Sequence, residues 1–167
     1  EKSFAWEPYG EYLDSRVARF MKKHAIGTWQ ELIRRSTEDI DWFWPAALED
    51  LGIEWFKPYK KLYDDSEGMP WTKWFVGGKT NIVHNCLDRH AKGENKDKKA
   101  FICIDEEGND TSVTYAELLE QANKCANALR SLGVKKGDRI VTYMPLVIEH
   151  AVVILACARI GAIHSVV

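Results

Sequence analysis

The sequence lacks the patterns that mark several common classes of protein. It carries 23 Lys and Arg against 25 Asp and Glu, so no basic excess supports nucleic-acid binding. The longest apolar run, 151–158, is too short to cross a bilayer, and the first residues show no basic-then-apolar signal pattern. The four cysteines form no Cys-x-x-Cys pair, which argues against a zinc ribbon or a disulfide framework. We therefore expect reduced thiols, a cytoplasmic location, and neither nucleic acid nor membrane as a partner.

Complete nucleotide-binding loops are also missing. No Gly-x-Gly-x-x-Gly fingerprint and no Gly-x-x-x-x-Gly-Lys-Ser/Thr loop occurs in the chain, which excludes a complete dinucleotide site or P-loop. The segment Gly77-Gly78-Lys79-Thr80 resembles the end of a P-loop but has no preceding glycine and strand. A phosphate cradle is not expected there.

The composition changes along the chain and predicts two regions. All seven tryptophans lie at or before Trp74, whereas the residues after Gly93 are rich in Val, Ile and Ala. The lysine-rich segment 93–99 between them is interpreted as a solvated loop. The sequence thus predicts one region over 1–93 and another over 94–167.

Helices dominate the first region. Apolar spacing from Tyr9 to His24 predicts an amphipathic helix that is ended by Gly27. Thr28 and Glu31 have the spacing of a capping box for the next helix. A further helix is predicted to reach Gly52.

Two features interrupt this helical pattern. Pro45 is expected to break or restart the third helix locally. The tryptophan-rich stretches 55–58 and 71–75 show no regular period and are predicted to be irregular. Their aromatic side chains are expected to pack against another surface, with a ligand platform as the alternative.

A short helix is predicted after the tryptophan-rich stretch. Asn81 could cap it, and Ile82, Cys86 and His90 would share one of its faces. The alternative is a zinc site, because His84, Cys86 and His90 are metal-ligand types. No fourth ligand accompanies them, and His84 and Cys86 point to different helix faces. The structural interpretation is preferred, and no metal residue is assigned.

The second region alternates strands and helices. Segments 100–104 and 111–113 flank a turn and predict a β-hairpin. Thr114 and Glu117 have capping-box spacing before a helix that stops at Gly133. A strand at 139–143, a helix at 146–160 and a final strand predict a right-handed β-α-β unit in a parallel sheet. Because the chain stops inside what is predicted to be a buried strand, we expect it to be a fragment.

Two polar groups offer functional alternatives to a structural role. Asp138-Arg139 could clamp a substrate, although a turn feature is preferred. Asp88-Arg89-His90 could supply a general base, since histidine titrates near neutrality. Docking of the first region onto the second is the preferred role for that block. Arg159 interrupts an apolar helix and is expected to form an ion pair or to snorkel at the helix end. Parallel-sheet geometry places ligands near Tyr143-Met144-Pro145 and just beyond Val167.

A combination of motifs carries a family resemblance over the chain from about Trp42 onward. The motifs are Trp74-Phe75-Val76-Gly77-Gly78-Lys79-Thr80-Asn81, Asn85-Cys86-Leu87-Asp88-Arg89-His90, Thr114-Tyr115-Ala116-Glu117-Leu118, Gly137-Asp138-Arg139-Ile140 with Met144-Pro145, and the ending from Leu155 to Val167. In this order they resemble the acetyl-CoA synthetase group of AMP-forming acyl-CoA synthetases, in the adenylate-forming superfamily. Thr80 and His84 stand where that group more often has Leu and Tyr, so the resemblance does not assign the carboxylic acid.

The resemblance implies an α/β fold, with a helical N-terminal cap followed by the first βαβ part of a parallel-sheet adenylate-forming domain. It implies that the full-length parent is a ligase that uses ATP, Mg²⁺ and coenzyme A to convert a small carboxylate into an acyl-CoA through an acyl-adenylate. The family's phosphate loop, acyl pocket, ribose-binding aspartate, hinge and C-terminal lysine have no counterpart here. No catalytic, cofactor-binding or metal residue is therefore assigned, and the fragment is expected to be inactive alone, with the remainder of the polypeptide as its partner. The alternative is a non-catalytic binding or assembly module with the same fold.

Overall fold

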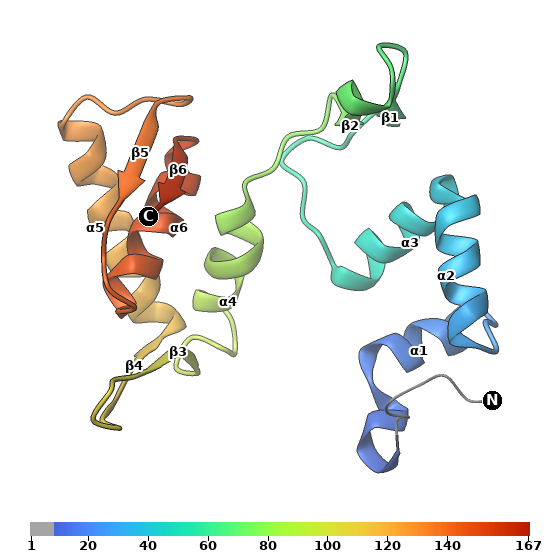
Figure 1. The fold of residues 1–167 in the computed structure, drawn as a ribbon, viewed down its shortest axis with the longest axis horizontal. Helices are drawn as coiled ribbons and strands as arrows, with labels where there is room; N and C mark the ends of the chain where they lie inside the picture. The colour runs from blue at the N-terminus through green and yellow to red at the C-terminus, as the bar shows by residue number, and fades with distance from the viewer. Residues whose placement is uncertain (1–8) are drawn as a thin grey trace. The chain divides into compact units, whose positions relative to one another are not determined.

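The structure, a computed structural model, describes residues 9–167 (Figure 1). The chain divides into two compact units. The first unit contains the described residues up to Ile53 together with Tyr59–Val76, and the second contains Glu54–Pro58 together with Gly77–Val167. No helix in the described part of the chain is both long and apolar enough to cross a membrane.

Three helices and a hairpin form the first unit. A 3₁₀ turn, η1 (Gly10–Asp14), precedes α1 (Arg16–Lys23), α2 (Trp29–Glu38) and α3 (Ile40–Leu51). The strands β1 (Lys61–Asp64) and β2 (Lys73–Val76) flank a 3₁₀ turn, η2 (Met69–Trp71), and pair in an antiparallel sheet. The core of the helices consists of Phe20, Ile26, Leu32 and Ala46, with Met21, Trp42 and Phe43 packed against it.

The predicted helix from Tyr9 to Gly27 is wrong at both ends. The side chain of Ser15 accepts a hydrogen bond from Ala18 N (3.3 Å) and caps α1. The helix therefore begins at Arg16, seven residues after Tyr9. The helix ends at His24, and Ala25 takes a left-handed conformation with φ 54°. Apolar residues recur at similar spacing in a 3₁₀ turn and in an α-helix. The spacing therefore does not reveal the N-cap that separates η1 from α1.

Thr28 caps α2 as predicted, but the reciprocal contact differs. Thr28 Oγ1 accepts a hydrogen bond from Glu31 N (3.1 Å), whereas Glu31 Oε2 accepts one from Gly27 N (2.9 Å). Each contact gives a hydrogen-bond acceptor to a backbone N–H at the start of the helix that has no partner within the helix.

The expected interruption at Pro45 is also wrong, because α3 runs continuously through this residue. Proline inside a helix costs about 3 kcal/mol. Tertiary contacts offset that cost, since Trp42 and Phe43 both pack against Phe20 and Ala46 is buried.

The tryptophan-rich stretch is irregular only in part, because 73–76 form β2. Tyr63 lies opposite Trp74, and their ring centroids are 5.6 Å apart. Trp74 also contacts Trp44 at 5.7 Å, which confirms the expected aromatic packing. A four-residue strand is too short for the alternation of apolar and polar residues to be recognised in the sequence. Cross-strand aromatic pairs stabilise this hairpin instead.

The second unit joins two small sheets to two long helices. A π-helical turn, η3 (His84–Asp88), continues into α4 (Arg89–Ala91); β3 (Lys99–Ile104) and β4 (Asp110–Thr114) form the predicted hairpin. They are followed by α5 (Tyr115–Ser131), β5 (Arg139–Thr142), α6 (Ile148–Ile160) and β6 (Ile163–Val166). The strands β5 and β6 pair in parallel, as the predicted β-α-β unit requires. The α/β class is confirmed.

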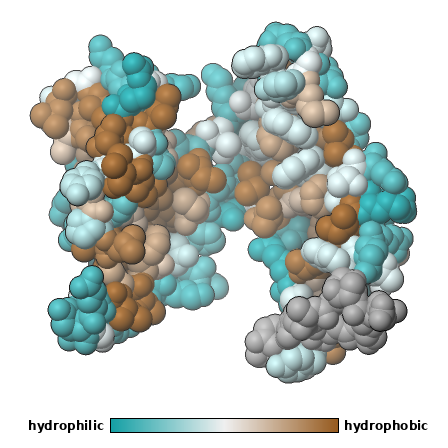
Figure 2. Space-filling view, viewed as in Figure 1, coloured by the Kyte–Doolittle hydropathy of each residue, from teal (hydrophilic) through white to brown (hydrophobic). Residues whose placement is uncertain are grey.

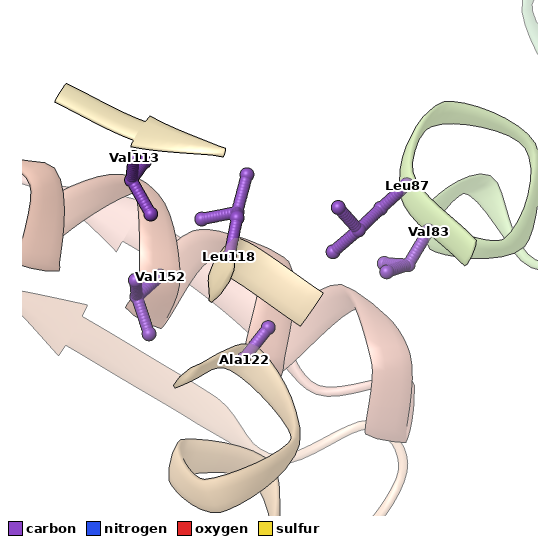
Figure 3. Packing of buried hydrophobic residues seen from close by; sticks show 6 residues of the cluster. All are labelled: Val83, Leu87, Val113, Leu118, Ala122 and Val152. Atoms are coloured by element: carbon purple, nitrogen blue, oxygen red, sulfur yellow. The ribbon is translucent and has the colours of Figure 1, made fainter. Parts of the chain in front are cut away.

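Two buried clusters hold these elements together. Figure 3 shows the first, in which Val83 and Leu87 from the π-helical segment meet side chains of β4, α5 and α6. The second lies between α5 and α6 and consists of Ala126, Ala156, Cys157, Ile160 and Ala162. Small side chains at this second contact let the two helices approach closely.

The final strand, expected to be buried, is exposed along its length. Figure 2 shows brown, apolar side chains at the surface over the part of the molecule that contains β5 and β6, where Val141, Ile163 and Val166 are all at least half exposed. Within residues 9–167, each strand of this sheet has the other as its only paired strand.

The predicted capping box at the start of α5 is present and leads to a pH prediction. Glu117 accepts hydrogen bonds from Thr114 N and Thr114 Oγ1, both at 2.8 Å, and these bonds lower the pKa of Glu117. A carboxylate with a lowered folded-state pKa stabilises the fold above its unfolded-state pKa, about 4.3. That contribution is lost as the pH falls through the lower folded-state value.

We therefore expect Glu117→Gln to be destabilising near neutral pH and progressively less so as the pH falls below about 4. Denaturant titrations of both proteins at several pH values measure the difference. Glu106→Gln, in the exposed hairpin turn, is the control for replacing an exposed glutamate by glutamine. Parallel stability curves for the wild type and Glu117→Gln would contradict the assignment.

Candidate functional site

The densest polar cluster of the second unit surrounds the π-helical turn η3. Asn81 begins this helical segment as predicted, because its Oδ1 accepts a hydrogen bond from Val83 N (2.9 Å). Its Nδ2 donates to the carbonyls of Ala158 (3.1 Å) and Arg159 (3.2 Å), at the C-terminal end of α6. Ala158 O also accepts from Gly161 N (3.2 Å) at the end of α6, and Asn81 adds a side-chain donor there, so it caps two helices at once.

Asn85 fastens the segment Glu54–Pro58 to the helix. Its side chain is 5% exposed. Asn85 Oδ1 accepts from Glu54 N (2.8 Å), and Nδ2 donates to Glu54 O (3.1 Å) and to Thr80 Oγ1 (3.0 Å). Thr80 Oγ1 in turn donates to Glu54 O (2.9 Å). The side-chain amide of Asn85 therefore bonds both the backbone N–H and the backbone C=O of Glu54.

His84 and Asp88 extend the cluster to α6. His84 Nε2 lies 2.6 Å from Glu54 Oε2, and His84 Nδ1 lies 3.9 Å from Asp88 Oδ2. Asp88 forms a two-pronged ion pair with Arg159, at 2.5 Å from Nη2 and 3.2 Å from Nη1. Only 16% and 21% of these two side chains are exposed, so the pair is largely shielded from water. The expected ion pair of Arg159 is confirmed, and its partner is Asp88.

The three possible zinc ligands have separate contacts. His84 contacts Glu54, the ring of His90 lies 5.5 Å from that of Tyr115, and the Cys86 thiol faces the carbonyl of Val83 at 4.0 Å. No group of three or more potential metal ligands occurs among residues 9–167. The structural interpretation of this helix is supported.

Asp138 has the role of a turn residue. Its Oδ2 accepts a hydrogen bond from Lys135 N (2.7 Å), which closes the turn before β5. Arg139 donates from Nη1 to the carbonyl of Gly137 (3.5 Å). Both contacts are local, as expected for a turn rather than a substrate clamp.

The carboxyl end of β5 holds a second, smaller polar group. The buried Thr142 Oγ1 donates to the carbonyl of Ser165 (3.2 Å) and lies 3.4 Å from His150 Nε2. Tyr143, the next residue, is exposed. Sequence reasoning pointed to Tyr143 and missed His150, although a single histidine within the apolar helix was a usable signal.

The four cysteines are free thiols. Burial raises the pKa of Cys86, Cys125 and Cys157. A raised pKa lowers the thiolate fraction near neutral pH, so these groups are poor nucleophiles. The thiol of Cys103 donates to the carbonyl of Leu146 (3.1 Å).

An open hollow lies in each unit. In the first unit, a hollow of about 300 Å³ lies among α1, α2 and α3 and is lined mainly by apolar side chains such as Val17, Trp29 and Ile33. In the second, a hollow of about 480 Å³ lies beside the β3–β4 hairpin and the starts of α5 and α6. Glu117 and Glu149 line it, together with Cys103, Ser112 and Gln121. The polar contacts described above link the elements of the second unit to one another.

Comparisons with known proteins identify the family to which the chain belongs. Residues 29–86 match the acetyl-coenzyme A synthetase N-terminus, and residues 87–167 match the AMP-binding enzyme family. An acetyl-coenzyme A synthetase of Methanothrix soehngenii is 43% identical over 92% of this chain and 23% of its own length. A 3-hydroxypropionyl-coenzyme A synthetase of Sulfurisphaera tokodaii is 49% identical over 81% of this chain and 20% of its own length.

A solved structure agrees with these relatives. The acetoacetyl-CoA synthetase from Streptomyces lividans matches 93% of this chain and 25% of its own, with 32% identity and a TM-score of 0.84. The chain thus spans between a fifth and a quarter of the proteins it resembles. It belongs to the AMP-forming, acetyl-CoA synthetase-like family of acyl-CoA synthetases and corresponds to their N-terminal part.

Proposed function

We propose that the chain is the N-terminal portion of a short-chain acyl-CoA synthetase, which makes an acyl-CoA from a carboxylate, ATP and coenzyme A. The observation that carries this proposal is the match of two consecutive family models over residues 29–167. The named relatives act on acetate-type and 3-hydroxypropionate-type acyl groups, as their names state. A small carboxylate is therefore the proposed substrate class.

The proposed reaction has two steps. A carboxylate oxygen attacks the α-phosphorus of ATP, which releases pyrophosphate and forms an acyl-adenylate. The sulfur of coenzyme A then attacks the acyl carbon, AMP leaves, and the thiol proton passes to solvent or a base. Mg²⁺, when bound, would neutralise phosphate charge in the first step. Mg²⁺ in such sites is held by one or two carboxylates together with substrate phosphates, and we assign none of the described carboxylates to it.

The role we assign to this chain within the reaction is structural. Asn85 and the Asp88–Arg159 pair hold the segment Glu54–Pro58, the π-helical turn and α6 in one body. The same unit presents β5 and β6, whose carboxyl ends are the expected place for ligands in a parallel sheet. We assign no catalytic, cofactor-binding or metal-binding residue to the chain.

We also propose the division into an N-terminal cap region, 1–93, and the start of the AMP-binding domain, 94–167. The two family models meet at residues 86 and 87, close to this boundary. A cytoplasmic location is proposed on the basis of the free thiols, which persist in reducing compartments. The remainder of the same polypeptide is the proposed partner of the chain.

An assay of thioester formation tests the proposed function. The 167-residue chain is expected to form no acyl-CoA above a no-enzyme control when it is given ATP, Mg²⁺, coenzyme A and acetate, propionate or 3-hydroxypropionate. The polypeptide read in frame through and beyond Val167 is expected to do so. Turnover by the short chain would contradict its assigned structural role. Absence of turnover by the longer polypeptide, with that polypeptide folded, would favour the alternative of a binding or assembly module.

A further inference from the structure

Two lysines of the second unit face each other across a short antiparallel bridge. Lys79 N donates to Lys57 O (2.8 Å), and Lys57 N donates to Lys79 O (3.1 Å). Residues that exchange both backbone bonds are directly opposed, and their side chains leave the same face of the pair. Their Cβ atoms are then about 5.5 Å apart or closer. The two lysine side chains therefore start from adjacent positions on the backbone.

The neighbours of these lysines show which way the pair faces. The ring of Phe56 lies 5.0 Å from that of His84, and Thr80 Oγ1 contacts both Glu54 and Asn85. Phe56 and Thr80 thus face the π-helical segment. Phe56 N also donates to Lys79 O (2.8 Å), so Phe56 and Lys57 both oppose Lys79, as in a β-bulge. Lys57 and Lys79 are both exposed, so their side chains reach solvent.

The bridge is braced from beneath. Asn85 holds the backbone N–H and C=O of Glu54, three residues before Lys57, and the hydroxyl of Thr80, next to Lys79. Both sides of the bridge are thus fixed to one buried amide. The lysines start from a defined spacing, which reduces the ordering cost of binding a ligand between them.

No carboxylate compensates this pair of charges within the described part of the chain. The lysines found in ion pairs there are Lys23, Lys61, Lys73, Lys96 and Lys124. Glu54, the acidic residue closest in sequence to Lys57, is engaged by His84. Like charges placed directly opposite each other destabilise a strand pair. The fold therefore holds two like-charged lysines opposite each other where Asn85 fixes the backbone.

We propose that Lys57 and Lys79 form a binding site for a phosphate group. A phosphate carries between one and a half and two negative charges near neutral pH and presents three acceptor oxygens, so it matches two ammonium groups better than a single carboxylate does. The side-chain ammonium groups bind it, so the expectation that Gly77–Thr80 forms no backbone cradle is unaffected. The site does not depend on the proposed ligase activity.

Titration of the 167-residue chain with inorganic phosphate tests the proposal. Amide resonances of Lys57 and Lys79 are followed by NMR, with sodium chloride added so that the ionic strength stays constant. Wild type is expected to show saturable shifts at these amides. Lys57→Gln and Lys79→Gln are each expected to weaken phosphate binding about tenfold, because each removes one charge-assisted contact.

Lys99→Gln is the matched control. Lys99 is also an exposed strand lysine in an antiparallel pair, but its opposite residue is the uncharged Thr114. It should bind phosphate as wild type does. In phosphate-free, low-salt buffer, Lys57→Gln and Lys79→Gln should also melt at a higher temperature than wild type, since each removes the repulsion, and Lys99→Gln should not. This second readout shows that the variants are folded.

Three results would overturn the proposal. The first is an equal response of wild type to phosphate and to chloride at the same ionic strength, which would reveal only screening. The second is an equal weakening by Lys99→Gln. The third is tighter binding of acetate or citrate than of phosphate, which would assign the lysine pair to carboxylates instead.

Discussion

Replacing Arg159 by methionine is expected to lower the free energy of unfolding of the second unit by about 3 kcal/mol. The change leaves the Asp88 carboxylate largely shielded from water and without its two-pronged partner. Breaking one side of a buried ion pair costs about 3–5 kcal/mol, and partial exposure places this pair at the lower end. Native-state hydrogen exchange of amides in α5 and α6 measures the loss for this unit alone.

Two further variants separate the missing charge from the missing packing. Adding Asp88→Leu to Arg159→Met is expected to recover most of the lost stability, because the isolated charge is then removed as well. Lys124→Met breaks the exposed pair of Lys124 with Glu120 and should change stability by less than about 1 kcal/mol. If Arg159→Met is as mild as Lys124→Met, the pair does not fasten η3 to α6.

Replacing Asn85 by alanine is expected to cost about 2–3 kcal/mol. The variant loses three hydrogen bonds and leaves the backbone N–H of Glu54 without its side-chain partner, whereas Glu54 O keeps the bond from Thr80 Oγ1. A buried polar group left unsatisfied costs about 1–3 kcal/mol. Protection from hydrogen exchange should fall most at Glu54 N, the donor to Asn85 Oδ1, and at the amides of the Lys57–Lys79 bridge.

Asn95→Ala is the control for this change. Asn95 lies in the exposed turn before β3, and surface changes of this kind shift stability by less than about 0.5 kcal/mol. Unchanged exchange at Glu54 N in Asn85→Ala would show that the segment Glu54–Pro58 is held by other contacts.

Local patterns predicted the second unit well. The β3–β4 hairpin, the capping box of Thr114 and Glu117, and the β5–α6–β6 unit all depend on residues within a few positions of one another or on one uninterrupted period. Such features are visible in sequence because the chemistry that makes them is local. Most motifs of the family resemblance lie in the same unit, and the first of them begins at Trp74 in the first unit.

The polar cluster could not be predicted in the same way. Asp88 and Arg159 are 71 residues apart, and Asn85 meets Glu54 across 31 residues. Spacing rules describe neighbours on one helix or strand and do not say which distant element a side chain will meet. The π-helical turn that presents these side chains also has no propensity signal of its own.

The errors in the first unit have a related cause. At Pro45 the local preference to break the helix was outweighed by burial of aromatic neighbours, and at Ser15 a side-chain cap moved the helix start. In both cases the sequence pattern was read correctly but a competing interaction decided the outcome. The lysine pair was missed because Lys57 and Lys79 belong to separate segments that meet only in the fold.

The discontinuous make-up of the second unit limits how such a protein can change by recombination. Glu54–Pro58 belongs to the second unit although first-unit segments precede and follow it in the chain. A single crossover point between Glu54 and Gly77 would join the helical segment that carries His84 and Asn85 to a foreign residue 54. Exchange of one unit between homologues therefore requires either three breakpoints or matched substitutions at Glu54, Thr80 and Asn85. These positions should be inherited together.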